Sequence, residues 1–111
     1  MPDRPEIVCI CGSARFADEI HAATRALTLA GAIVLAPTLF PPTASLTDDQ
    51  KTALGTLHLH KIDLADRVLI VNPGGYLGES TTREIAHAHT TNKPITFTNP
   101  QPPSQAQDVH P

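Results

Sequence analysis

The chain has 111 residues and a formal net charge of −3, which allows one domain of ordinary size. It has no long basic run, so we do not expect a nucleic-acid polymer as a partner. The N-terminus lacks a secretory pattern, and no apolar run approaches the roughly 20 residues that span a bilayer, so we expect a cytoplasmic protein that does not interact with membranes.

The first third of the chain has the pattern of strand, helix and strand. Residues 7–11 form a continuous apolar run that ends at Gly12, as is typical of a parallel strand buried on both faces. A helix should follow and end before Gly31, which suits a left-handed cap, and residues 32–36 should form the second strand. Apolar residues recur along this helix at helical spacing: Phe16, Ile20, Ala23, Leu27 and Ala30.

A proline-containing segment, residues 37–45, then leads to a second helix. This segment is either a simple connection or a stiff loop that overhangs a site. Thr47 and Gln50 have the spacing of a capping box at the start of the helix, which should run to about Ala65. Its apolar residues at helical spacing are Ala53, Leu57 and Leu64.

The last third repeats the alternation. Residues 68–71 should form a third strand, residues 80–90 a helix, and residues 94–98 a short fourth strand. The final segment has little to bury, so we predict a domain over residues 1–99 and a disordered tail over residues 100–111.

This order of elements predicts the α/β class. The expected architecture is a single-domain, three-layer sandwich of the Rossmann or flavodoxin type, with a small parallel sheet in the order 2-1-3-4, with or without one further strand. In that order strands 1 and 3 are neighbours, and ligands of such sheets bind where the loops after these two strands meet. The predicted site is therefore formed by residues 12–15 and 72–80.

Both of these segments have features of phosphate-binding turns. The first reads CGSAR, and the second is rich in glycine and opens directly into a helix, whose N-terminus offers free N–H groups and a positive dipole end. Arg15 and Ser13 could hold a 5′-phosphate by charge-assisted hydrogen bonds. Tyr76 either stacks on a base or packs beneath its own loop. The predicted substrate-binding residues are Gly12, Ser13, Arg15, Asn72, Gly75, Tyr76, Gly78 and Ser80.

Glu84 is the central candidate for catalysis. It lies on the helix that follows the second turn, beside the predicted ligand. Thr81, three positions earlier, gives a competing interpretation, since the two residues also have the spacing of a capping box.

With CGSAR after strand 1 and Glu84-Ile85-Ala86-His87-Ala88 after the glycine-containing loop, residues 7–97 resemble the nucleoside 2-deoxyribosyltransferase family. The compact relatives that hydrolyse nucleoside 5′-monophosphates are the nearest in length. The resemblance implies that Glu84 is the nucleophile that cleaves an N-glycosidic bond, by hydrolysis or by sugar transfer, without a cofactor. It also implies a homodimer, and that the Gly12-Ser13-x-Arg15 turn lies at the sugar and phosphate end of the pocket.

One departure from the family concerns the proton donor. Family members usually have an aspartate on the helix before strand 3, and the matching position here is His58, whereas Asp63 is the nearest carboxylate. Either of these residues, or His60, could protonate the leaving base, and otherwise the catalytic set is incomplete.

No metal site is expected from the spacing of ligands along the chain. Cys9 and Cys11 point the same way from a strand, are too tightly tethered for an ordinary disulfide, and have no Cys or His pair after them at zinc spacing, so free thiols are expected. The pair His58 and His60 and the pair His87 and His89 are spaced by two residues, which does not place either pair on one helical face.

The sequence leaves an alternative function from another class. Residues 73–76, Pro-Gly-Gly-Tyr, also resemble the PGG-x-G-T loop of cytokinin-activating phosphoribohydrolases and the nucleotide-sensor domains related to them. That resemblance implies a nucleotide-binding or sensing module without catalysis. In both interpretations the partner is a small nucleoside or nucleotide.

Overall fold

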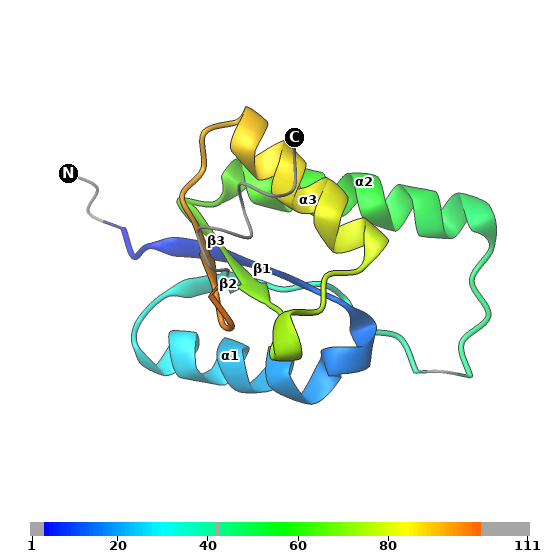
Figure 1. Cartoon of the computed structure of the whole chain (residues 1–111), viewed down its shortest axis with the longest axis horizontal. Helices are drawn as coiled ribbons and strands as arrows, with labels where there is room; N and C mark the ends of the chain where they lie inside the picture. The colour runs from blue at the N-terminus through cyan, green and yellow to red at the C-terminus, as the bar shows by residue number, and fades with distance from the viewer. Residues whose placement is uncertain (1–3, 42, 101–111) are drawn as a thin grey trace.

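The computed structural model describes residues 4–41 and 43–100, which form three layers with a sheet between helices (Figure 1). The tail over residues 100–111 that we predict to be disordered lies outside the described residues except for Pro100. Within the described part of the chain, no helix is both long and apolar enough to cross a membrane.

The sheet has four parallel strands in the order β2-β1-β3-β4. These are β1 (Ile7–Gly12), β2 (Ile33–Leu35), β3 (Arg67–Val71) and β4 (Ile95–Phe97). The strand order and the α/β class are confirmed, and the described residues contain no further strand. Because β1 and β3 are neighbours, the two predicted site loops leave the same edge of the sheet.

Helices cover both faces of the sheet (Figure 1). Helix α1 (Ala17–Leu29) lies on one face, and α2 (Asp48–Leu64) and α3 (Glu79–Thr90) lie together on the other. Two short 3-10 turns, Ala14–Phe16 and Pro73–Gly75, follow β1 and β3.

Local signals explain where the helices begin and end. The hydroxyl of Thr47 accepts a hydrogen bond from the Gln50 N–H at 3.0 Å, and the Gln50 side chain accepts one from the Thr47 N–H at 2.9 Å, so the predicted capping box is confirmed. Gly31 follows α1 with a φ of 99°, the left-handed conformation expected of a cap.

The side chains of β1 alternate between two buried clusters. Ile10 faces α1, where it packs with Ile20 and Val71. Cys9 and Cys11 face the opposite way and share their cluster with residues of α2, α3 and the neighbouring strand: Ile62, Ala65, Val68, Ile70 and Ala88.

The predicted apolar side of α2 is wrong. Leu57 and Leu64 are 54% and 67% exposed, whereas His58 and Ile62 are the buried residues of this helix. The apolar residues of α2 are distributed around the helix, so their spacing alone does not determine which side packs on the sheet.

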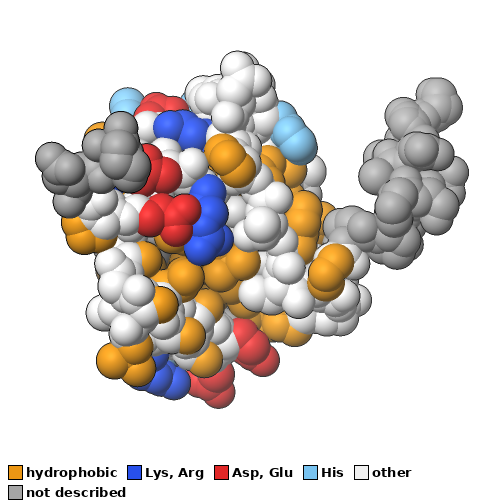
Figure 2. Space-filling view, turned by 90° about the vertical axis from the view of Figure 1, so that its left-hand side faces the viewer, with side chains coloured by type: hydrophobic (Ala, Val, Ile, Leu, Met, Phe, Trp, Pro, Cys, Tyr) orange, Lys and Arg blue, Asp and Glu red, His pale blue; other side chains and the backbone are white. Residues whose placement is uncertain are grey.

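Ion pairs lie at the amino ends of the strands. The Arg4 guanidinium donates to both oxygens of Asp66 at 2.7 and 3.0 Å, and the Ile7 N–H donates to the same carboxylate at 2.8 Å. The Arg67 side chain pairs with Glu6 at 3.0 Å. Acidic and basic side chains accordingly lie side by side on this face of the molecule (Figure 2).

Candidate functional site

Glu84 lies in the second turn of α3 and does not cap the helix. The helix begins at Glu79 after Gly78, without a side-chain cap, and Thr81 is buried within the first turns. The capping-box interpretation of Thr81 and Glu84 is therefore wrong. The Glu84 side chain is half-buried between the helix and the sheet.

A cluster of buried polar side chains lies beside Glu84. Nε2 of His58 lies 3.4 Å from Sγ of Cys11 and 3.6 Å from Sγ of Cys9. Both cysteines are free thiols with no exposed surface, as predicted, and His58 is only 5% exposed. The residues that converge here come from β1, α2 and α3.

These groups shift each other's pKa values. Burial raises the pKa of Glu84, and the positive charge of His58 and the contact with Cys11 offset part of that rise. Burial alone lowers the pKa of His58, but the hydrogen bond and charge of Cys9 and the charge of Glu84 raise it above its ordinary value. The hydrogen bond with Cys11 lowers the pKa of Cys9 to about 6. The same bond, together with burial, raises the pKa of Cys11.

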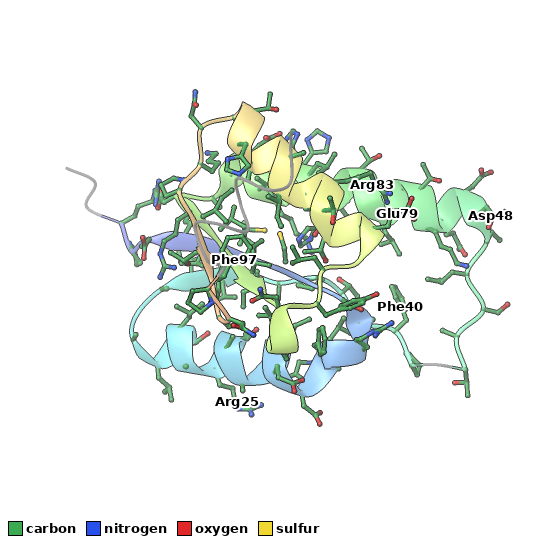
Figure 3. All side chains as sticks on the ribbon, viewed as in Figure 1. Arg25, Phe40, Asp48, Glu79, Arg83 and Phe97 are labelled. Atoms are coloured by element: carbon green, nitrogen blue, oxygen red, sulfur yellow. The ribbon has the colours of Figure 1, made fainter. Side chains whose placement is uncertain are left out.

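A cavity of about 960 Å³ opens beside this cluster. Glu84 and His58 both form part of its wall, with Ser80 and Arg83 of α3 nearby. The segment after β2 forms the opposite wall, with Phe40 at the same end of the molecule as the first turns of α3 (Figure 3). The other lining residues are Ala14, Pro37, Thr38, Leu39, Pro41, Ala44, Ser45, Leu46, Lys51, Thr52, Leu54, Gly55, Thr56, Leu57, Leu59 and Lys61.

The turn after β1 is built around Arg15 and Tyr76. The Ser13 hydroxyl accepts a hydrogen bond from the Arg15 N–H at 3.3 Å and so begins the 3-10 turn. The Arg15 guanidinium lies 4.0 Å from the centre of the Tyr76 ring, and Phe16 meets that ring edge-on at 5.8 Å. Tyr76 remains 40% exposed, and Ala14 of the same turn reaches the cavity. The structure thus brings Arg15 and Tyr76 together, but of this turn only Ala14 is among the residues that line the cavity.

The start of α3 connects this aromatic cluster to the cavity. Gly78 lies against Tyr76, since a Cβ added to Gly78 would lie 3.5 Å from the Tyr76 hydroxyl. Ser80, about one turn before Glu84, accepts a hydrogen bond from the Arg83 side chain at 3.3 Å and lines the cavity.

Three other predicted binding residues have structural contacts instead. A Cβ on Gly12 would lie 3.0 Å from the Val71 carbonyl oxygen, so glycine is needed for the close approach of β1 and β3. The Asn72 side chain is fully buried, donates to the Asn99 carbonyl at 2.9 Å and accepts from the Asn99 N–H at 2.9 Å. The Gly75 N–H donates to the Asn72 carbonyl at 2.8 Å.

Asp63 lies apart from Glu84. Its carboxylate lies 2.8 Å from Nε2 of His87 and 3.9 Å from Nδ1 of His60, on the exposed side of α2 and α3. It is not among the residues that line the cavity. Of the proposed proton donors, the structure places only His58 with Glu84.

Lys61 belongs to the site although the sequence analysis does not single it out. Its ammonium donates to the Ala36 carbonyl at 2.8 Å and lines the cavity. It follows His58 by three residues and so shares its side of α2, a signal already present in the sequence.

Comparisons with known proteins give evidence at the level of the fold. No protein-family model matches the chain, and no curated protein matches it in sequence. The chain is similar in structure to a 2-deoxyribosyltransferase from the psychrotolerant bacterium Bacillus psychrosaccharolyticus, with a TM-score of 0.65 and 16% identity. The alignment covers 82% of this chain and 70% of that one. The chain therefore has the fold of a nucleoside 2-deoxyribosyltransferase.

Proposed function

We propose that this protein cleaves the N-glycosidic bond of a nucleoside or a nucleoside 5′-monophosphate, with water or a second base as the acceptor of the sugar. The observation that carries the proposal is the position of Glu84, half-buried beside His58 in the wall of the cavity of about 960 Å³. The fold shared with a 2-deoxyribosyltransferase supports it.

In this reaction Glu84 is the nucleophile. Its carboxylate attacks the anomeric carbon while the bond to the base breaks, and the bonding electron pair leaves with the base nitrogen. Water or an acceptor base then displaces the carboxylate from the sugar. Partial burial suits this step because a carboxylate stabilises developing positive charge more strongly in a site of low polarity.

His58 is the proton donor. It reaches the cavity and lies close enough to Glu84 for each charge to influence the other pKa. Burial lowers the pKa of His58, but the hydrogen bond and charge of Cys9 raise it above its ordinary value, a shift in the direction that suits a proton donor.

Arg15 holds the 5′-phosphate in this proposal. Its guanidinium is exposed and is held over the ring of Tyr76, and the preceding residue, Ala14, lines the cavity. The helix N-terminus at Gly78 and Ser80 adds backbone donors on the neighbouring side. Contacts with a remote phosphate would orient the sugar over Glu84.

A nucleotide-binding or sensing module without catalysis is the second candidate. The isolation of Asp63 favours it, because Glu84 has no second carboxylate near it in the cavity wall. Such a module would bind the same nucleotides without releasing base.

We also expect a homodimer. Leu64 is 67% exposed on α2 and is not among the residues that line the cavity, and burying it against a second copy would remove apolar surface from water. Light scattering coupled to size exclusion at micromolar concentration should give the mass of two chains, and Leu64→Glu should give the mass of one. A wild-type monomer at that concentration would contradict this expectation.

The main test is release of free base from a panel of ribonucleosides, deoxyribonucleosides and their 5′-monophosphates, with and without a second base. Chromatography should detect released base, and Glu84→Gln should reduce turnover by at least about 10³-fold, since the amide keeps the shape but loses the charge. Glu79→Gln is the matched control on the same helix. The Glu79 side chain is 93% exposed, and its carboxylate pairs with Arg83 at the long distance of 3.8 Å. Binding of nucleotides without any release would favour the sensing module, and full turnover by Glu84→Gln would exclude the nucleophile role.

A further inference from the structure

The cysteines of β1 and a histidine of α2 form a group with the donor atoms of a metal site. Cys9 and Cys11 are two residues apart on one strand and so face the same way, and His58 reaches them from another layer. The two sulfur atoms and the ring nitrogen of His58 all lie within 4.8 Å of one another. Linear spacing hides this group, because 47 residues separate Cys11 from His58.

We propose that Cys9, Cys11 and His58 bind one Zn²⁺ ion beneath the wall of the cavity. Usual Zn–S and Zn–N bond lengths in a tetrahedral site place sulfur and nitrogen roughly 3.6 Å apart. The two observed sulfur–nitrogen distances are 3.4 and 3.6 Å. Both sulfur–nitrogen separations therefore already suit a tetrahedral ion, and the two sulfurs lie within 4.8 Å of each other, against the roughly 3.8 Å that such an ion requires.

The surroundings of the group favour a metal over hydrogen bonds alone. The two thiols have no exposed surface and the imidazole is nearly buried, and a thiol is a weak hydrogen-bond donor and acceptor. A bound cation would satisfy the three donor atoms together. Each thiol that binds the ion releases its proton to solvent, and His58 binds through its neutral Nε2.

Zn²⁺ fits this donor set better than other common cations. Two sulfurs and one imidazole exclude Mg²⁺ and Ca²⁺, which take oxygen ligands. The described residues supply three donor atoms that lie within 4.8 Å of one another, so a water molecule would complete the tetrahedral set. A set of two thiolates, one imidazole and one water is a known tetrahedral arrangement for Zn²⁺.

Metal binding has a consequence for the reaction, which rests on the proposed function. Zn²⁺ would occupy Nε2 of His58 and keep the imidazole neutral, so that His58 could not protonate a departing base. The ion would then be an inhibitor, and the metal-free protein would be the active form.

The test of binding uses the full chain, freed of metal and kept reduced, and titrated with Co²⁺. We expect an intense thiolate-to-cobalt band in the near ultraviolet at one ion per chain, and we expect Zn²⁺ to abolish the band by displacing Co²⁺. Because this band requires a cobalt–sulfur bond, the wild-type protein alone decides the matter. Absence of the band would overturn the proposal.

Variants then assign the ligands. Loss of a residue that only hydrogen-bonds to a metal ligand costs about 10–100-fold in metal affinity. Loss of a direct ligand should cost more, so Cys9→Ala and Cys11→Ala should each weaken Co²⁺ binding at least about 100-fold. His89→Gln, an exposed histidine of α3, is the control and should bind as the wild type does. Thermal unfolding without metal, measured by circular dichroism, shows whether each cysteine variant folds. If one variant does not fold, the other variant tests the site. Equal affinity in a folded cysteine variant and the wild type would exclude that cysteine as a ligand.

Inhibition is measured separately. If base release is found, equimolar Zn²⁺ should suppress it and a chelator should restore it, whereas unchanged turnover with bound Zn²⁺ would exclude the inhibitory role. If no substrate in the panel is cleaved, the proposed function fails while the cobalt titration still decides the metal site.

Discussion

The two faces of the sheet are built from different chemistry, although the same strands supply both. On the α1 face, Ile10 packs against Ile20 and Val71, and the cluster around them is apolar. On the face covered by α2 and α3, Cys9 and Cys11 pack against His58. A single step along β1 therefore moves from an apolar core to a buried polar group.

This difference separates stability from function within a small domain. Burying polar side chains costs free energy unless they are paired, so a fold that needed only stability would use apolar residues on both faces. The cavity opens on the polar face, where Glu84 and His58 reach it. We therefore expect substitutions on the two faces to have different consequences.

The largest effect on stability should come from the α1 face. Ile20→Ala removes a fully buried side chain and leaves a cavity, so the free energy of unfolding should fall by about 2–5 kcal/mol. Denaturant titration measures this loss, and the kcat of the folded protein should remain close to that of the wild type. Ile33→Ala, at an exposed site, is the control. A large loss of kcat in folded Ile20→Ala would break the separation of the two faces.

A substitution on the polar face should instead lower turnover more than stability. His58→Asn should lower kcat by about 10²-fold or more, because the departing base loses its proton donor, with little change in KM. The assay contains a chelator so that metal binding does not contribute. Asp63→Asn is the control and should keep nearly full turnover, since this carboxylate pairs with His87 away from the cavity. The opposite ranking would make Asp63 the donor.

A smaller effect is expected from Arg15, at the edge of the polar face. A hydrogen bond to a charged group is worth about 1.5–3 kcal/mol, so Arg15→Ala should lower kcat/KM for 5′-monophosphates by roughly 10–100-fold. Unphosphorylated nucleosides should be much less affected. Arg25→Ala is the control, because Arg25 is exposed on α1 (Figure 3). Equal losses for both substrate classes would indicate that Arg15 serves only to pack on Tyr76.

The smallest effect concerns the amino ends of the strands, which belong to neither face. The hydrogen bond from Arg4 contributes most to holding the pKa of Asp66 well below its usual range. The hydrogen bond from the Ile7 N–H and the charge of Lys93 act in the same direction. A carboxyl with a lowered folded-state pKa stabilises the fold above its unfolded pKa of about 3.9, and this contribution is lost as the pH falls below that value. Unfolding measured between pH 6 and pH 2 should therefore show a smaller pH dependence in Asp66→Asn than in the wild type, and the same change in Arg4→Ala. Identical pH profiles would exclude this role.

The sequence predicts the frame of the molecule better than its interior. The apolar run before Gly12 and the alternation of elements are local signals, and the order 2-1-3-4 is predicted from flavodoxin-like sheets, which have the same alternation. The prediction of which side of α2 faces the sheet is wrong, because His58 is buried at a position that apolar spacing assigns to solvent. Whether Asp63 faces the site depends on how α2 and α3 pack, which no local signal reports.

The same limit applies to the polar group on β1. Alternation along a strand places Cys9 and Cys11 on one face, but it does not say which helix covers that face or which residue of that helix reaches them. The contact with His58 depends on the rotation of α2 about its own axis, and the distribution of apolar residues around this helix leaves that rotation open.

The buried amide of Asn72 sets a minimum length for a chain that folds. Its side chain is bonded to the backbone N–H and carbonyl of Asn99, two residues beyond the end of β4. A chain cut after Phe97 would keep every residue of the sheet but would leave this amide without those partners, at a cost of about 1–3 kcal/mol for each unpaired group. The unit that can be shortened or fused without loss of stability therefore extends to Asn99, past the last strand.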